Sequence, residues 1–240
     1  MKQIGLIILI TFIIIGCGNS KEQKKELKII VETEAPTIIT NNNTDTIFNF
    51  DISENFTSDW SQYYTGKEGE KPNWQIIDDN GNKVLAQLSS DNPNYHFNDI
   101  VFNNLELKNM ELSVKMKGVE GSMDQGGGFI WRFTDANNYY VVRANPLEDN
   151  VVLYKVENGR RTDLAVVGKG RTYGVDVKPL GSDWNNLRLT VVDNLFSVFL
   201  NNEQIFQVED NTFKNAGKIG LWTKADAVTY FDEFKVKSIN

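Results

Sequence analysis

The stretch GGGFIWRFTDANNYYVVRA, residues 126–144, concentrates side chains that could bind a polar ligand. It carries Arg132 and Arg143 together with Asp135 and Tyr139. Arginine donates paired hydrogen bonds to carboxylates, phosphates or neighbouring hydroxyls, and a tyrosine ring beside it can contact a sugar. Alternatively, neighbouring carboxylates could neutralise both arginines through internal salt bridges. The stretch therefore predicts either a polar binding surface or a network of ion pairs.

The two arginines can act on one ligand only if they share a face of the hairpin that this stretch predicts. If residues 135–138 form a four-residue loop, Thr134 pairs with Tyr139, and side chains then alternate between the two faces of the sheet. The face expected in the core carries Phe129, Trp131, Phe133, Tyr140, Val142 and Ala144, and the other face carries Ile130, Arg132, Thr134, Tyr139, Val141 and Arg143. A change of register by one residue would exchange the two faces.

A second group of candidates lies near the C-terminus, in the strings GLWTKAD and FDEF. Trp222 is close in sequence to Asp226, and a sugar platform needs an exposed ring beside polar groups. Trp222 could instead be buried in the core, and Asp226, like Asp135, could instead form a turn. Asp232, with the backbone around Asp51, is the candidate site for a structural calcium ion, because calcium needs only oxygen ligands.

Several common catalytic arrangements find no support in the sequence. His96 is the only histidine and Cys17 the only cysteine, so neither a Ser-His-Asp triad nor a histidine-rich metal site is indicated. We expect His96 in a strand with its ring nitrogens satisfied. The chain also lacks a Glu-x-Asp-x-x-Glu string, which would place two carboxylates about 5–10 Å apart for glycoside hydrolysis. The string IDDNGNK lacks the spaced ligands of a calcium loop and predicts a hairpin turn.

Short apolar runs separated by turn residues fill the chain from Ile47 onward. Strands are predicted in KVLAQL (83–88), LELKNMELSVKMK (105–117), NLRLTVV (186–192), LFSVFL (195–200) and VTYFDEFKVK (228–237). Asn-Gly or paired Asn and Asp residues at 79–82, 157–159, 193–194 and 201–202 predict tight hairpins. The pattern favours one all-β domain, residues 47–240, built as an antiparallel two-sheet β-sandwich.

The N-terminus predicts export and a lipid anchor. After Lys2 comes an apolar segment that is too short to span a bilayer, which needs roughly 20 apolar residues. It ends in Ile-Ile-Gly-Cys17, which resembles a bacterial lipobox, where the cysteine is acylated, for example with palmitate. We expect a lipoprotein signal peptide at 1–16 and a lipidated N-terminus with a flexible tether at 17–46. The alternative is an ordinary signal peptide with an incidental cysteine.

Charge and composition limit the partners. The formal net charge is −7 and becomes −8 when Lys2 is lost with the cleaved signal peptide. A negative charge disfavours binding to nucleic acid and to anionic lipid headgroups. The membrane would therefore be reached through the lipid anchor only, and two or more acyl chains are enough for stable anchoring. Gly18 is not an acidic retention signal, which favours the outer membrane of the bacterial cell envelope. The sequence leaves the oligomeric state open.

A family resemblance is carried by three strings, GGGFIWRFTDANNYYVVRANPLEDNVVLYKVENGRR, WNNLRLTVVDNLFSVFLNNEQIFQVED and GKIGLWTKADAVTYFDEFKV. Together they resemble the concanavalin A-like, laminin G-like sandwich domains, and in particular the bacterial 3-keto-disaccharide hydrolase domains, over about residues 47–238. The resemblance implies a jelly roll with one concave sheet, which carries Arg132 and Arg143 and commonly binds sugars. In place of the family's Tyr-Glu-x-Gln-like strand the chain has Tyr-Val-Val-Arg at 140–143, which removes a carboxylate.

Three functions are compatible with these features. The leading hypothesis is a lipid-anchored, carbohydrate-binding or glycan-processing accessory domain whose concave face binds sugar hydroxyls or uronates. The alternative is a hydrolase or lyase that acts on oxidised disaccharides or glycosides. The third is a structural or protein-interaction module of the envelope. A cleft with two close carboxylates would favour the enzyme, whereas exposed aromatic rings with arginines would favour the sugar-binding domain.

Overall fold

A computed structural model of the chain describes residues 39–41, 45–48, 50 and 59–239. Cys17 and the predicted signal peptide lie outside the described residues. The predicted tether, 17–46, lies mostly outside them as well, but its end already contributes strand residues 39–41 and 45–46, ahead of the predicted domain start at Ile47. Within the described part of the chain, no helix is long and apolar enough to cross a membrane.

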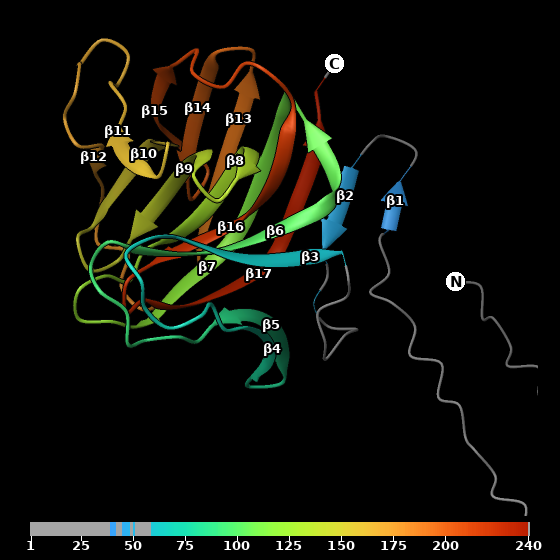
Figure 1. Ribbon diagram of the computed structural model, residues 1–240, viewed down its shortest axis with the longest axis vertical. Helices are drawn as coiled ribbons and strands as arrows, with labels where there is room; N and C mark the ends of the chain where they lie inside the picture. Colours follow the sequence, from blue (N-terminus) through green and yellow to red (C-terminus); the bar gives the residue numbers. More distant parts are fainter. Residues whose placement is uncertain (1–38, 42–44, 49, 51–58, 240) are drawn as a thin grey trace, which may run out of the picture. The chain divides into compact units, whose positions relative to one another are not determined.

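The described residues form two antiparallel sheets, here called A and B, which lie one over the other (Figure 1). The strands of sheet A are β1 (Ile39–Asn41), β2 (Asp45–Phe48), β17 (Val228–Ser238), β7 (Met110–Glu120), β13 (Asn185–Val192), β14 (Leu195–Leu200) and β15 (Glu203–Glu209), with β5 (Asn82–Gln87) and β4 (Trp74–Asp79) joined at β17. The strands of sheet B are β11 (Arg160–Asp163), β10 (Asn150–Glu157), β9 (Asn138–Asn145), β8 (Gly127–Asp135), β16 (Gly217–Lys224), β6 (His96–Leu107) and β3 (Trp60–Gly66), with β12 (Val175–Asp176) paired to β10. The predicted β-sandwich is confirmed.

The predicted tight turns are confirmed by their backbone. Asn80, Asn158, Asp193 and Asn201 all have φ between 49° and 58°, in the left-handed region that Asn and Asp tolerate. Each lies between two consecutive strands, and the Asp78 carboxylate accepts the Gly81 N–H across the β4–β5 turn. Short polar sequences therefore set the hairpin connections of both sheets.

The main core lies between the two sheets. Along β7, Met110, Leu112, Val114 and Met116 are buried while the residues between them are partly exposed, because side chains alternate across a strand. From sheet B the same core receives Phe129, Trp131, Tyr140, Val142 and Ala144. These five residues were expected on the core face, and their position is confirmed.

A bulge in β8 changes the predicted hairpin. Trp131 pairs with Tyr140 and Asp135 with Asn138, so the loop has two residues rather than four, and the register shifts between the two pairs. Arg132 lies in this bulge with φ 47°. The bulge turns Phe133 to the outer face of sheet B, where its ring lies 5.2 Å from that of Tyr63. The predictions that Phe133 is in the main core and that residues 135–138 form a four-residue loop are wrong.

Sheet B is curled, and its outer face is concave. Five strand spacings separate the edge strand β11 from β6, or about 24 Å in a flat sheet. The guanidinium of Arg161 on β11 nevertheless lies 4.9 Å from the ring of Phe97 on β6 and 4.4 Å from that of Tyr154 on β10. A second apolar cluster fills the concave face, and Trp222, Ile130 and Val141 belong to it.

Part of the concave face is covered by the bent β8–β9 hairpin. The Thr65 hydroxyl on β3 donates to the backbone carbonyl of Ala136 at the hairpin tip. It also lies 2.9 Å from the Tyr139 hydroxyl and 3.3 Å from a carboxylate oxygen of Asp99. These residues form the covered part of the concave face, and Asp99 and Tyr139 are fully buried there.

Candidate functional site

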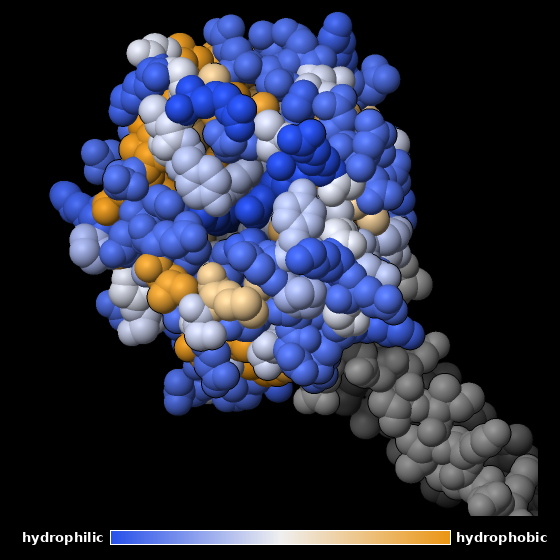
Figure 2. Space-filling view, turned by 60° about the vertical axis from the view of Figure 1, so that its left-hand side comes forward, coloured by the Kyte–Doolittle hydropathy of each residue, from blue (hydrophilic) through white to orange (hydrophobic). Residues whose placement is uncertain are grey.

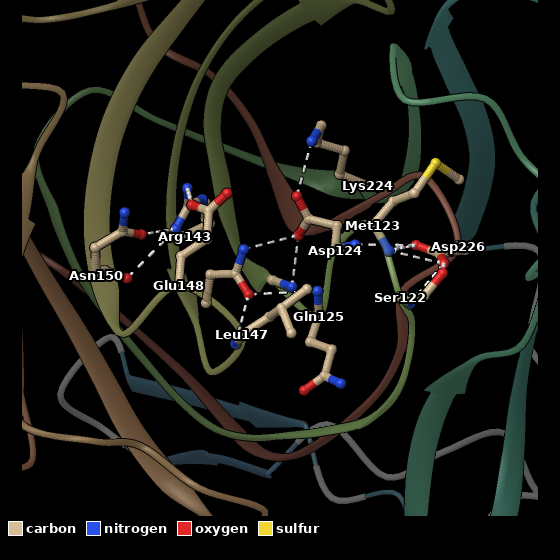
Figure 3. Close-up of polar contacts among 12 residues, drawn as sticks. Ser122, Met123, Asp124, Gln125, Arg143, Leu147, Glu148, Asn150, Lys224 and Asp226 are labelled. Atoms are coloured by element: carbon tan, nitrogen blue, oxygen red, sulfur yellow. Dashed lines mark hydrogen bonds and ion pairs between the residues drawn. The ribbon is translucent and has the colours of Figure 1, made fainter.

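The part of the concave face that the hairpin leaves open is lined by charged side chains from two strands and two loops. Arg143 and Lys224 lie at the ends of β9 and β16 and share the outer face with Val141 and Trp222. The β7–β8 loop supplies Asp124, and the β9–β10 loop supplies Glu148 (Figure 3). We call Asp124, Arg143, Glu148 and Lys224 the charged cluster.

Asp124 and Lys224 form a buried ion pair. The Lys224 Nζ lies 2.8 Å from Asp124 Oδ2, and the two side chains are 9% and 1% exposed. The other carboxylate oxygen of Asp124 accepts the N–H of Gly126 at 2.7 Å and the side-chain amide of Asn145 at 3.3 Å. A buried ion pair contributes little net stability compared with apolar packing, but removing one partner would leave an uncompensated buried charge.

Arg143 is buried and donates to three side chains and, at 3.3 Å, to the backbone carbonyl of Asn150. Its guanidinium donates to Glu148 at 2.6 Å, to the side-chain oxygen of Asn150 and, at 3.4 Å, to the Tyr154 hydroxyl. Burial disfavours its charge, but Tyr154, Asp124 and Glu148 outweigh burial and raise its pKa. Its Nε donor is buried without a partner among the described residues. Arg143 is therefore a fixed cation that is 1% exposed and has one buried donor without a partner among the described residues.

The two ion pairs of the cluster lie close together. A Cβ on Gly126 would approach an Asp124 carboxylate oxygen to 2.8 Å and the Arg143 Cδ to 3.1 Å, so a larger residue there would force one of these side chains to shift. Glu148 is the exposed member, with 37% of its side chain accessible. Burial opposes its ionisation, but Arg143 outweighs burial and lowers the pKa of Glu148. The cluster is neutral in sum and offers both donors and acceptors.

Asp226 holds the loop that carries Asp124. Its carboxylate accepts the backbone N–H groups of Ser122, Met123 and Asp124 at 2.7–3.1 Å, and the Ser122 hydroxyl at 3.0 Å. Burial opposes its charge, but these donors outweigh burial and lower the pKa of Asp226. Asp226 is a predicted ligand-binding residue. In this structure its carboxylate binds the backbone of the loop that carries Asp124, a member of the charged cluster.

Arg132, by contrast, does not lie on the concave face. The bulge directs its guanidinium to the backbone carbonyls of Lys108, Asp193 and Phe213, at the ends of three connections. Burial lowers the pKa of Arg132, and Tyr140 and Asp193 oppose that effect. The prediction that Arg132 and Arg143 share one face is wrong, because a bulge cannot be read from strict alternation.

Trp222 and Tyr139 do lie on the concave face, but neither ring is exposed. The curled sheet and the bent hairpin cover both rings, so Trp222 takes the buried alternative and neither residue forms an exposed aromatic platform. Asp135 accepts the Asn137 N–H and the Asn138 amide within the hairpin turn, which is the turn-forming alternative. Asp232 accepts hydrogen bonds from Asn82 and from the Glu233 N–H.

No group of three or more His, Cys, Asp or Glu side chains that could hold a metal ion occurs among the described residues. Asp51, the suggested partner of Asp232 in a calcium site, lies outside them. His96 begins β6, and its two ring nitrogens lie 2.7 Å from the Lys67 carbonyl and 3.2 Å from Asn98 Oδ1, as predicted. A surface cavity of about 420 Å³ involves none of the charged cluster and is lined by Glu70, Lys71, Asn73, Leu88, Ser89 and Ser90.

Sequence reasoning missed Asp124, Glu148 and Lys224 as members of one site. They come from segments far apart in the chain, and only the pairing of β8 with β9 and β16 brings them together. A signal was present in SMDQGGG, where an aspartate precedes three glycines that allow close approach. The side of the molecule that carries β10, β11 and β12 comes forward in Figure 2 and shows a hollow with mainly hydrophilic walls.

Comparisons with known proteins agree with this fold. A sequence model of the family described as the 3-keto-alpha-glucoside-1,2-lyase-like domain matches residues 44–237. A search of curated proteins finds no match. The predicted resemblance to the keto-disaccharide hydrolase domains and to the concanavalin A-like sandwich is confirmed.

Two solved structures illustrate the shared fold. The carbohydrate-binding module CBM66 from Bacillus subtilis is 19% identical, with a TM-score of 0.55 over 75% of this chain and 96% of the module. Domain 4 of AbnA, an extracellular GH43 arabinanase from Geobacillus stearothermophilus solved with arabinotriose, is 16% identical, with a TM-score of 0.50 over 82% of this chain and 92% of that domain. At these identities the likeness establishes the sandwich fold.

Proposed function

Because the chain belongs to the 3-keto-alpha-glucoside-1,2-lyase-like domain family, we propose that the open part of its concave face binds a glucoside-type carbohydrate. The observation that carries the proposal is the charged cluster, in which two cations and two carboxylates are held at one end of a concave sheet. Sugar hydroxyls both donate and accept hydrogen bonds, and a cluster that is neutral in sum matches them. The CBM66 and arabinanase-domain folds add support, since both names refer to carbohydrates.

The test is sugar binding by matched arginine variants. Isothermal titration would compare the wild-type chain with Arg143→Gln and Arg188→Gln, using methyl α-glucoside and its 3-keto form as probes. Arg188 is a suitable control because it lies on sheet A and pairs with Glu111. We expect Arg143→Gln to weaken binding by about 30-fold or more, equivalent to about 2 kcal/mol, and Arg188→Gln to leave it unchanged. Equal binding by all three proteins would place the ligand elsewhere.

A second candidate is eliminative cleavage of a 3-keto glucoside, and the half-exposed Glu148 carboxylate favours it. A ketone at C3 acidifies the proton on C2, which Glu148 would remove while Arg143 and Lys224 stabilise the enolate oxygen. The ketone then re-forms, the C1–C2 double bond is made, and the C1–O bond to the aglycone breaks. The leaving oxygen takes a proton, so the step needs no oxidant and no reductant.

Elimination has a direct spectroscopic test. Its product is an enone, whose ultraviolet absorbance grows as the 3-keto form of methyl α-glucoside is consumed. We expect turnover by the wild-type chain and none by Glu148→Gln, with sugar binding still measurable in that variant because the amide oxygen also accepts hydrogen bonds. Binding without any enone would leave the carbohydrate-binding function and remove the lyase.

Export and lipid anchoring belong to the same proposal. The lipobox-like string that ends at Cys17 would place an acylated N-terminus in the bacterial envelope, with the sandwich on a tether. Growth with labelled palmitate is expected to label the wild-type chain in the membrane fraction and to leave Cys17→Ala unlabelled. Equal labelling of both, or of neither, would contradict the anchor.

A further inference from the structure

The described residues include two large aromatic side chains that are exposed, Tyr64 and Tyr173, at 44% and 49%. Tyr64 lies on β3 on the same face as Trp60, which packs against the main core, and its ring stacks on His96 at 5.1 Å. It therefore lies on the side of sheet B away from the concave face. Tyr173 is the exposed ring to consider beside the charged cluster.

Tyr173 lies next to the residues that hold Arg143. Its ring meets that of Tyr154 edge to face, with the centroids 6.0 Å apart and the planes at 72°. The Tyr154 hydroxyl in turn contacts the Arg143 guanidinium at 3.4 Å. Burial lowers the pKa of Arg143, and Tyr173 is one of the groups that raise it, with a smaller effect than Tyr154, Asp124 and Glu148. The exposed ring is thus at the edge of the cluster.

The backbone at Tyr173 is strained, although the residue packs little against the protein. Its φ is 55°, a region that bulky side chains rarely adopt. Residues held in such a conformation by the surrounding structure are concentrated at binding and catalytic sites. The backbone at Tyr173 is held in this conformation while its ring stays half exposed.

The segment around Tyr173 is fixed on both sides. Before it, Arg171 pairs with Asp163 at the end of β11. After it, Gly174 has φ 78° and passes so close to β10 that a Cβ would lie 2.2 Å from the Val151 carbonyl oxygen. Because β12 then pairs with β10, the ring is held in place before any ligand binds. A preformed platform loses little conformational entropy on binding.

We propose that Tyr173 is the stacking platform of the site, and that it receives the apolar face of a pyranose ring whose hydroxyls reach the charged cluster. This inference rests on the proposed carbohydrate binding and names the residue that selects for ring shape. A pyranose has a flat face of C–H groups, which packs on an aromatic ring, and hydroxyls at its rim, which Arg143 and Glu148 can bind. Arg143 then binds the hydroxyls at the rim of the sugar, and Tyr173 packs against its C–H face.

The experiment uses the full chain with methyl α-glucoside and its 3-keto form, titrated into wild type, Tyr173→Phe, Tyr173→Ala, Tyr173→Gly and the control Tyr64→Ala. We expect Tyr173→Phe to bind within about twofold of wild type, and Tyr173→Ala and Tyr173→Gly to bind about tenfold more weakly. Tyr64→Ala should bind like wild type, because that ring lies on the other face.

Tyr173→Gly separates binding from stability. Glycine adopts a positive φ without strain, so its thermal midpoint should equal or exceed that of wild type while its binding falls. In parallel, tetranitromethane should nitrate both exposed tyrosines, and a saturating sugar should protect Tyr173 but not Tyr64.

The outcomes distinguish this inference from the function on which it rests. If wild type binds neither probe, the proposed function fails. If wild type binds a probe and Tyr173→Ala and Tyr173→Gly bind it equally well, the function stands and the role of Tyr173 is overturned. Nitration of Tyr173 that the sugar does not reduce would also overturn it.

Discussion

The concave face buries one aspartate in its open part and another in its covered part, and the two are stabilised in different ways. Asp124 in the open part pairs with Lys224 and accepts two further hydrogen bonds. Asp99 in the covered part meets no cation, accepts from the Thr65 hydroxyl, and has its other oxygen buried without a partner among the described residues. Burial raises the pKa of Asp99 well above its ordinary value, and Thr65 and Tyr139 only partly oppose this effect.

The buried carboxyl group of Asp124 has a cationic partner, whereas that of Asp99 has none among the described residues. Asp124 pairs with a lysine and accepts from two donors, Gly126 next to the loop that Asp226 holds and Asn145 at the end of β9. Within the described part of the chain, Asp99 has only hydroxyl groups as donors, and burial outweighs them, so the neutral acid is favoured there. The ligand binding that we propose belongs to the open part, where the charged cluster lies.

The largest expected effect comes from breaking the ion pair of the open part. Lys224→Met leaves the Asp124 carboxylate buried without its cation and should lower the free energy of unfolding by about 3–5 kcal/mol. The double variant Lys224→Met with Asp124→Asn should recover most of that loss, because no unpaired charge remains. Urea unfolding of the two single variants and the double variant measures the coupling. Additive losses would show that the pair does not act as one unit.

Arg132 stabilises the covered part of the concave face, because its hydrogen bonds fix the bulge that bends the hairpin over that face. Arg132→Met removes the donor from three backbone carbonyls and should cost about 3 kcal/mol, or about 6–12 °C in the thermal midpoint. Sugar binding at a temperature where the variant is folded should stay at the wild-type level. A binding loss as large as that of Arg143→Gln would mean that the covered part also touches the ligand.

Lys224 and Arg132, compared with the turn residues, show which parts of the structure can be predicted from the sequence. Asn80 and Asn158 were enough to predict hairpins, because a tight turn requires local positive φ and needs no distant partner. The main-core face of β8 and β9 followed from alternation up to Trp131. Beyond it the bulge at Arg132 depends on carbonyls from three distant connections, and no local turn residue marks it. Lys224 and Asp124 meet only after β16 pairs with β8, so their ion pair has no signature within one segment.

A smaller effect is expected from the residue that positions the open part. Asp226→Asn replaces a carboxylate that accepts three backbone N–H groups and should cost about 2 kcal/mol at pH 7. Since the pKa of Asp226 is lowered in the folded state, its stabilisation is present above the unfolded pKa of about 3.9 and is lost as the pH falls through the folded value. The difference between wild type and variant in urea should therefore shrink below pH 4. A difference that does not change with pH would contradict the ionic role.

The smallest effect, and of opposite sign, belongs to the covered part. Asp99→Asn removes a group whose folded pKa is raised, so the folded state binds the proton more tightly and wild-type stability falls as the pH rises from about 3.9 toward the folded pKa. The variant lacks this fall and should be about 1 kcal/mol more stable than wild type at pH 8, with little difference at pH 4. Urea unfolding at both values makes the measurement, with sugar binding as the control. A loss of stability at pH 8 would mean that the Asp99 charge is supported after all, and the contrast between the two aspartates would not hold.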